Sequence, residues 1–286
     1  MDAVFAEETF ESSNGAEIFF RSWIPDAPRA VVVICHGVNS HGGQYTWVAE
    51  QLADRGMAVF ALDLRGRGKS SGRRFYVDDI AEYVNDLSGL IRLAGARRPG
   101  LPIFLLGHSA GGVVSCMYAL ENQQELAGLI CESFAFKVPA PDFALAIIKG
   151  LSFILPNLPV LKLKNADFSR DPTAVAKLNA DPLIAKEVQP AKTVAALVRA
   201  DERLRKSFGS ITLPVFILHG TADKATLPAG SQFFYDTAGS LDKTLKLYDG
   251  HFHDLLNDLG REGVMSDMQG WIDRRVAGAG GQSMVT

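Results

Sequence analysis

The stretch Gly107-His108-Ser109-Ala110-Gly111 decides the fold of this chain, because of what lies on either side of it. An apolar run at residues 101–106 precedes it, and a helix-compatible stretch at residues 112–120 follows it. A serine hydroxyl is a poor nucleophile until a base takes its proton, so a reactive serine must be exposed at a sharp strand-to-helix turn. Glycines two residues before and after Ser109 suit such a turn, where a Cβ atom would collide with neighbouring backbone. The segment therefore predicts a nucleophile elbow with Ser109 at its tip.

Strand-like and helix-like segments alternate along the chain around this elbow. The expected strands are residues 16–23, 30–35, 57–62, 102–106, 126–131, 214–218 and 244–248. Several are continuous runs of Val, Ile, Leu and Phe, which is typical of strands covered on both faces. The expected helices lie around residues 44–54, 77–93, 113–122, 231–237 and 264–275. This alternation predicts an α/β fold, with a mostly parallel sheet between helices and a functional site at the carboxyl ends of the strands.

The alternation breaks between Phe136 and about Ile211, a gap too long for a single loop. Seven of the 13 prolines fall in the part of this gap before Ala191, as expected for short, repeatedly broken helices. We expect a core of residues 1–136 and 191–276, a cap of residues 137–190 inserted over the strand ends, and a disordered Gly-rich tail at 277–286.

The expected cap contains an apolar segment, residues 143–161, whose only charged side chain is Lys149. Pro156, Asn157 and Pro159 interrupt it, whereas a membrane span needs roughly 20 continuous apolar residues, so we do not expect it to cross a bilayer. Two interpretations stay open. The segment could be a cap helix packed on the core, or an apolar lip that admits acyl chains and contacts lipid surfaces.

The 286-residue chain is 47% apolar and 21% charged, which is the composition of an ordinary soluble globular protein. Its formal net charge of -3 is mixed along the chain, so we expect no nucleic acid partner. Residues 1–13 lack the basic start and apolar core of a secretory signal, which makes the cytoplasm the expected compartment. Cys35, Cys116 and Cys131 have spacings that fit neither a zinc site nor a redox pair, and we expect buried free thiols.

Acid and base candidates for activating Ser109 follow two later strands. A catalytic serine needs a base within hydrogen-bond reach and an acid that orients this base. Asp223 follows the sixth expected strand, and His251 and His253 both follow the seventh, so all three are expected at carboxyl strand ends. The order serine, aspartate, histidine is the chain order expected for such a sheet. Spacing alone does not choose between His251 and His253.

Other acids and histidines are weaker candidates for these roles. The rival acids, all less well placed, are Asp63, Asp249 and Asp254. Asp223 could also be an Asx turn that merely stabilises its own loop. The histidines that we interpret as structural or pocket-lining are His36, His41 and His108.

Backbone amides near the elbow are candidates for an oxyanion hole. A tetrahedral intermediate needs donors for its negative oxygen, and removing one costs about 3 kcal/mol. The amide of Ala110 follows the nucleophile, and the amide of Val38 has the matching offset in the loop after the expected strand 30–35. Alternatively, the loop that contains Val38 is a simple glycine-assisted turn. This chemistry requires no metal and no organic cofactor.

With these features together, the chain resembles the α/β-hydrolases of the monoacylglycerol lipase and lysophospholipase group, including serine aminopeptidase S33-like hydrolases. Besides the elbow, the resemblance is carried by HGVNSHGGQY (36–45), DLRGRGKS (63–70) with Gly72, NADPL (179–183) and DKTLKLY (242–248). It runs across nearly the whole chain and implies an eight-stranded, mostly parallel sheet with the cap inserted after the sixth strand. The family's catalytic histidine stands three residues after a glycine that follows the last strand, which matches His253 and Gly250.

The resemblance also implies where the alcohol part of a substrate binds. The family's best-known mammalian members hold a glycerol head group with a glutamate, an arginine and a tyrosine, and the matching positions here are Ser40, Gln44 and Leu178. None keeps the family's residue type, although Ser40 and Gln44 can still form hydrogen bonds. His108, beside the nucleophile, is the fourth expected substrate-binding residue.

We therefore expect a serine hydrolase that cleaves monoacylglycerol-like or other apolar monoesters through an acyl-enzyme. Its partner would be a small ester substrate with an apolar acyl group. The alternatives are a general carboxylesterase for short-chain, medium-chain or aromatic esters, a lysophospholipase, a peptidase or amidase on the same scaffold, and a binding protein without catalysis. The oligomeric state is not predicted.

Overall fold

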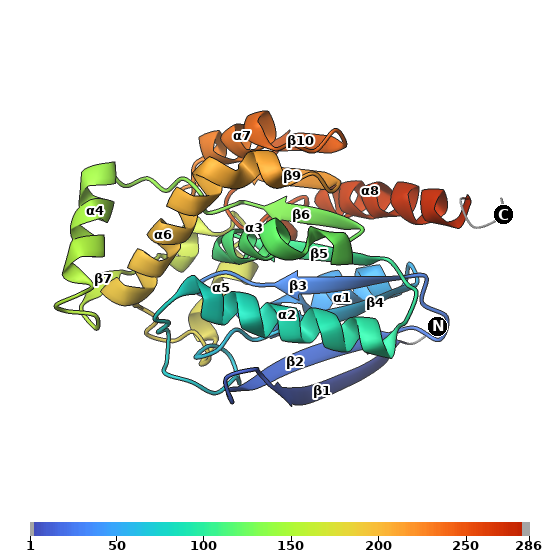
Figure 1. The fold of residues 1–286 in the computed structure, drawn as a ribbon, viewed down its shortest axis with the longest axis horizontal. Coiled ribbons are helices and arrows are strands. Elements are labelled where there is room, and N and C mark those ends of the chain that lie inside the picture. Colours follow the sequence, from blue (N-terminus) through green and yellow to red (C-terminus); the bar gives the residue numbers. More distant parts are fainter. Residues whose placement is uncertain (1–2, 282–286) are drawn as a thin grey trace.

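A computed structural model describes residues 3–281, which form an eight-stranded sheet covered by helices on both faces (Figure 1). The strands are β1 (Val4–Glu11), β2 (Glu17–Ile24), β3 (Ala30–Cys35), β4 (Met57–Leu62), β5 (Ile103–His108), β6 (Gly128–Glu132), β9 (Val215–Gly220) and β10 (Lys243–Tyr248). Their order in the sheet is β1-β2-β4-β3-β5-β6-β9-β10. β2 pairs antiparallel with β1 and β4, and the other neighbours pair in parallel. The predicted eight-stranded, mostly parallel sheet is confirmed.

The helices that cover the sheet are α1 (Thr46–Ala53), α2 (Ile80–Arg97), α3 (Ala110–Asn122), α6 (Ala191–Ser207), α7 (Pro228–Thr237) and α8 (Arg261–Gly281). Side chains of α2, α3, α6 and α7 share one apolar core, and those of α1 and α8 share another. The two cores lie on opposite faces of the sheet because successive strand residues point to opposite sides.

Strand β3 illustrates how the apolar runs predicted this arrangement. Val31 and Val33 belong to the core beneath α2 and α3, whereas Val32 and Ile34 belong to the core beneath α1 and α8. All six residues of β3 are buried. Such a strand has no polar face, because helices exclude water from both of its sides.

Strand β1 was not predicted, and its burial pattern gives the reason. It is an edge strand in which half-buried and exposed residues alternate, and the described segment VFAEETFE contains three glutamates. An edge strand packs little of its surface into the core, so no apolar run marks it.

At the other end of the chain, the expected disordered tail began at residue 277, but α8 continues to Gly281. This part of the expectation is wrong, because the helix packed beneath the sheet extends beyond its apolar segment. The remaining residues of the tail, 282–286, lie outside the described residues.

The segment between residues 137 and 190, the expected cap, lies outside the regular alternation of strands and helices. Its elements are α4 (Asp142–Leu151), β7 (Pro159–Leu161), α5 (Pro172–Ala180) and β8 (Gln189–Pro190). β7 and β8 pair antiparallel, and α4 packs against α6. In Figure 1, α4 and β7 lie at one end of the molecule, beyond α6. Among the described helices, none combines the length and the apolar character that a membrane span requires.

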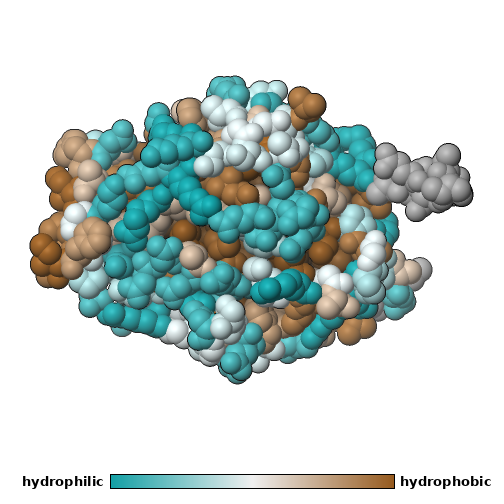
Figure 2. All heavy atoms as spheres, in the orientation of Figure 1, coloured by the Kyte–Doolittle hydropathy of each residue, from teal (hydrophilic) through white to brown (hydrophobic). Residues whose placement is uncertain are grey.

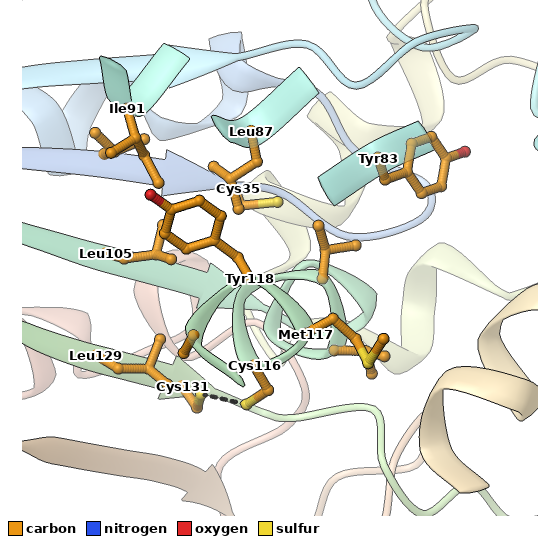
Figure 3. Close-up of a cluster of buried hydrophobic side chains, with 14 of the residues drawn as sticks. Cys35, Tyr83, Leu87, Ile91, Leu105, Cys116, Met117, Tyr118, Leu129 and Cys131 are labelled. Atoms are coloured by element: carbon orange, nitrogen blue, oxygen red, sulfur yellow. Dashed lines mark hydrogen bonds between the residues drawn. The ribbon is translucent and has the colours of Figure 1, made fainter. Parts of the chain in front are cut away.

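The three cysteines are buried free thiols, as expected. Figure 3 shows Cys116 of α3 facing Cys131 of β6, with their Sγ atoms 3.7 Å apart. Burial raises the pKa of the Cys35 thiol above its ordinary value. All three buried thiols therefore contribute to packing, and that of Cys35 does not offer a reactive thiolate.

Candidate active site

Ser109 stands at the turn between β5 and α3, and its backbone has φ 54° and ψ -121°. A non-glycine residue rarely adopts a positive φ, so this strained turn persists only because its surroundings hold it. A Cβ atom at Gly107 would lie 2.5 Å from Ser115 Oγ and 2.7 Å from the Gly111 carbonyl oxygen. The glycine is therefore required by close packing of strand against helix. The predicted elbow is present, with Ser109 at its tip.

Asp223 lies just after β9, in a loop that satisfies both of its carboxylate oxygens. Oδ1 accepts hydrogen bonds from the amides of Ala225 at 2.7 Å and Thr226 at 2.9 Å, which is the geometry of an Asx turn. Oδ2 accepts one from Thr226 Oγ1 at 2.7 Å and faces Nδ1 of His253 at 2.8 Å. The two interpretations of Asp223 are thus compatible, since one oxygen orders the loop and the other meets an imidazole.

His253 is fully buried, and the carboxylate at its Nδ1 leaves its other ring nitrogen available. Within residues 3–281, Nε2 of His253 has no hydrogen-bond partner. The edge of Phe168 packs on the ring, with 4.9 Å between ring centroids. A carboxylate at Nδ1 holds an imidazole in the tautomer whose Nε2 can accept a proton.

His251, the alternative that spacing left open, lies elsewhere on the same loop. Its Nδ1 is 3.7 Å from Asp258, and its ring packs beside Tyr248. Burial and Arg170 lower the pKa of His251. The structure therefore brings His253, and not His251, to Asp223.

His219, to which sequence reasoning assigned no role, approaches the same carboxylate. Its Nε2 lies 3.1 Å from Asp223 Oδ2, and its Nδ1 lies 2.8 Å from Ser231 Oγ. Burial alone would raise the pKa of Asp223, but His253 and His219 outweigh it and hold this pKa well below its ordinary value. The carboxylate is therefore ionised at neutral pH. The available signal was the position of His219 at the end of β9, four residues before Asp223.

A second buried group of ionisable side chains lies next to this pair. His108, Glu132 and Asp254 each offer an atom within 4.8 Å of the others, and these are the ones among the described residues whose spacing could hold a metal ion. Burial raises the pKa of Glu132 and of Asp254, and burial together with His253 lowers the pKa of His108 to about 3. Burial favours the uncharged forms of Glu132 and His108, whereas Asp254, whose pKa is raised to about 6, stays mostly ionised at neutral pH. Glu132 was not singled out from the sequence, and Asp254 was considered only as a rival acid.

The loop after β3 packs directly on the elbow. A Cβ atom at Gly37 would lie 2.8 Å from Ser109 Cβ and 3.0 Å from the His108 carbonyl oxygen. Val38 and Ala110 both line the cleft into which Ser109 opens. The loop thus brings the Val38 backbone beside the nucleophile, where the sequence predicted an oxyanion donor.

The cleft above Ser109 has a volume of about 340 Å³ and is mostly apolar. Its walls come from α4, the β7 region and α6, through the side chains of Leu145, Ile148, Val160, Leu161, Val194 and Leu197. Pockets of this kind bury most of a small apolar ligand. These wall residues were not predicted individually, because only folding brings α6 beside the inserted segment.

The four residues expected to bind substrate lie outside the lining of this cleft. His108 is buried between the rings of His253 and Tyr45. Gln44 donates to Asp181 at 3.1 Å, and Leu178 lines a second cleft of about 720 Å³. Ser40 is buried in the loop after β3. The polar atoms expected to meet an alcohol are directed to protein partners or covered by packing. The roles of these residues in substrate binding stay predictions.

Comparison with known proteins identifies relatives over almost the entire chain. The family model "Serine aminopeptidase, S33" matches residues 26–260. The monoacylglycerol lipase of Mycolicibacterium smegmatis is 34% identical, covering 93% of this chain and 96% of that protein. The monoglyceride lipase of Homo sapiens is 33% identical, covering 94% of this chain and 91% of that protein. A crystal structure of Paleococcus ferrophilus monoacylglycerol lipase superposes with a TM-score of 0.80 at 29% identity, covering 97% of this chain and 99% of the other.

Proposed function

We propose that this chain, which belongs to the serine aminopeptidase S33 family, prefers esters that carry a long apolar acyl group, with monoacylglycerols as the leading substrate class. The chain has the α/β-hydrolase fold and is a serine ester hydrolase. The observations that carry the proposal are the buried contact of His253 with Asp223 at 2.8 Å and an elbow serine that opens into an apolar cleft. Relatives named as monoacylglycerol lipases support the choice of substrate.

In the proposed mechanism, Ser109 Oγ attacks the ester carbonyl while its proton passes to Nε2 of His253. The Asp223 carboxylate orients the imidazole and stabilises the imidazolium that forms. The imidazolium then protonates the departing alcohol, and an acyl-enzyme remains. Water attacks this acyl-enzyme with His253 as base, which releases the carboxylic acid and restores Ser109.

Two backbone amides are the proposed donors to the negative oxygen of each tetrahedral intermediate. They belong to Val38 and Ala110, which line the same cleft as Ser109. Preorganised donors at this position lower the barrier because their hydrogen bonds to the negatively charged intermediate are stronger than those to the neutral carbonyl.

Residues 137–190 are the proposed cap, and its surface supports a role at lipid surfaces. Phe143, Phe153 and Ile154 are 70%, 74% and 79% exposed, respectively. Figure 2 shows hydrophobic residues gathered at the end of the molecule where Figure 1 places α4 and β7. Exposed apolar patches of this kind mark interaction surfaces, and here the patch belongs to the elements that wall the cleft. We propose that this end of the cap contacts the surface of a lipid aggregate.

A general carboxylesterase is the second candidate, and one observation favours it. The Gln44 carboxamide, expected to meet glycerol, donates to Asp181, and Ser40 does not line the cleft. Without polar groups fixed toward a glycerol, the enzyme would discriminate esters by the acyl chain alone.

A substrate panel tests the proposal. We would measure kcat/KM for monoacylglycerols and p-nitrophenyl esters with acetyl, octanoyl and dodecanoyl chains, together with a lysophospholipid and an anilide. We expect values that rise from acetyl to the longer chains, and higher values for monoacylglycerol than for lysophospholipid or anilide. Equal rates for glycerol and aryl esters would favour the general carboxylesterase. The variant Ser109→Ala, unlabelled by a fluorophosphonate and inactive on every ester, is the control that ties the activity to this site.

A further inference from the structure

The loop that carries Val38 depends on a residue in an unfavourable backbone conformation. Asn39, the next residue, has a φ of 51°. This left-handed region is disfavoured for most residues with a Cβ atom and is tolerated best by Asn, and two hydrogen bonds hold Asn39 in it here. The backbone N–H of Asn39 donates to Glu187 Oε1 at 2.9 Å, and its side chain donates to Asn165 at 3.2 Å. Both partners come from the inserted segment and not from the loop itself.

Glu187 is itself held by a buried polar network. Its Oε1 also accepts a hydrogen bond from Gln189 Nε2 at 2.6 Å and pairs with the guanidinium of Arg67. Arg67 further donates to Gln189 Oε1 at 2.8 Å. The side chains of Arg67 and Glu187 are each 1% exposed. A buried carboxylate is tolerated when it is paired and hydrogen-bonded, so the acceptor offered to Asn39 is fixed in position.

We propose that Glu187 is a positioning residue for the oxyanion hole. Its carboxylate, anchored by Arg67 and Gln189, holds the N–H of Asn39, one peptide unit after the N–H of Val38, and thereby restrains the backbone of Val38 so that its amide is aimed toward the reacting carbonyl. This inference rests on the proposed role of the Val38 amide. Arg67 has a second effect, since its positive charge offsets the carboxylate that would otherwise oppose negative charge developing nearby.

The arrangement makes the inserted segment part of the catalytic geometry. Asp181 of the inserted segment makes two further contacts with the loop after β3. Its Oδ2 lies 2.8 Å from Nε2 of His41 and accepts a hydrogen bond from Nε2 of Gln44 at 3.1 Å. A displacement of residues 181–187 would therefore move the donor loop, and other residues of the same inserted segment, among them Leu145 and Leu161, wall the cleft. Binding of substrate and stabilisation of its transition state are coupled through one segment.

The test uses the full chain and separates positioning from folding. Glu187→Gln retains a side-chain oxygen acceptor, whereas Glu187→Leu removes it, and both single variants leave the charge of Arg67 without its carboxylate. The double variant with Arg67→Met and Glu187→Leu removes both buried charges together, so folding should recover while the acceptor stays absent. Asn165→Ala, which removes the side-chain contact of Asn39 together with an exposed hydrogen bond to Asn179 but keeps the backbone contact to Glu187, is the matched control.

We expect the double variant to lower kcat for a p-nitrophenyl ester by about 10-fold to 100-fold with little change in KM, as for a misplaced catalytic donor. A trifluoromethyl ketone, whose adduct carries the oxyanion, should lose affinity by the same factor. Glu187→Gln and Asn165→Ala should stay within a few-fold of the parent. A folded double variant with parental kcat and inhibitor affinity would overturn the inference. Failure of the proposed function has a different signature, namely ester turnover that survives Ser109→Ala.

Discussion

His219 and His253 approach one oxygen of Asp223 from two elements: Nε2 of the first lies 3.1 Å from Oδ2 and Nδ1 of the second lies 2.8 Å from it. Thr226 Oγ1 donates to the same oxygen at 2.7 Å. The carboxylate is thereby saturated with donors, which fixes its direction and keeps it ionised. The two histidines differ in what the second ring nitrogen of each one contacts. His219 uses it to meet Ser231, whereas that of His253 has no partner within residues 3–281.

This difference predicts unequal effects of removing each imidazole. His253→Ala should lower kcat/KM for an ester by about 10⁴-fold or more, since the proton acceptor is lost. His219→Phe should lower it by about 10-fold at most, because Asp223 keeps His253, Thr226 and two amides as donors. Steady-state kinetics of the two purified variants provide the measurement. Comparable losses of kcat/KM in the two variants would show that His219 takes part in proton transfer and does not only hold Asp223.

Acid should destabilise the fold through His108. Its pKa is lowered from 6.5 to about 3, so the unfolded chain binds more protons between these values. The stability it contributes is therefore complete above pH 6.5 and decreases as pH falls toward 3. Below pH 6.5 the free energy of unfolding falls by about 1.4 kcal/mol for each unit of pH, so the loss reaches about 2 kcal/mol near pH 5.

Urea unfolding at several pH values measures this effect. His108→Gln should show a shallower decrease of unfolding free energy between about pH 6.5 and pH 5 than the parent. Glu132→Gln should have the opposite effect and make the decrease steeper. Burial raises the pKa of Glu132, so the folded chain binds this proton more readily than the unfolded chain as pH falls. Parallel pH profiles for parent and His108→Gln would contradict the expectation.

The wall of the cleft should set the longest acyl chain that fits. Leu145 lines the cleft from α4 and is half-buried. Leu145→Trp should fill part of the volume of about 340 Å³ and lower kcat/KM for dodecanoyl esters much more than for acetyl esters. Chain-length profiles of parent and variant test this. Ile147→Trp, at a position on the same helix that is 56% exposed, is the control and should leave the profile unchanged.

The exposed end of the cap should matter only for aggregated substrate. Phe153 and Ile154 are 74% and 79% exposed, so replacing both by Ser should not affect folding by much. We expect slower hydrolysis of emulsified long-chain monoacylglycerol and an unchanged rate on a water-soluble short-chain ester. Flotation with phosphatidylcholine vesicles measures the surface contact directly. Equal vesicle binding by the parent and the double variant would rule out this surface as the contact.

The fold could be predicted where local pattern and global burial coincide. The run of apolar residues in β3 is explained by a strand that is covered on both faces. The elbow glycines are explained by a turn that leaves no room for Cβ atoms. β1 escaped prediction because an edge strand with alternating exposure carries little apolar signal.

The sequence by itself determined seven of the eight strands of the sheet, the elbow at Ser109 and the candidate acid at Asp223, because each leaves a signal in the residues around it. Spacing left His251 and His253 open and the family resemblance favoured His253, which is the one that the tertiary structure brings to this acid; only the tertiary structure revealed that His219 and Glu187 join the site at all. The physical reason is that a hydrogen bond requires atoms within about 3 Å. Asn39 and Glu187 are 148 residues apart in the chain, and nothing but the packing of the inserted segment on the sheet brings them together.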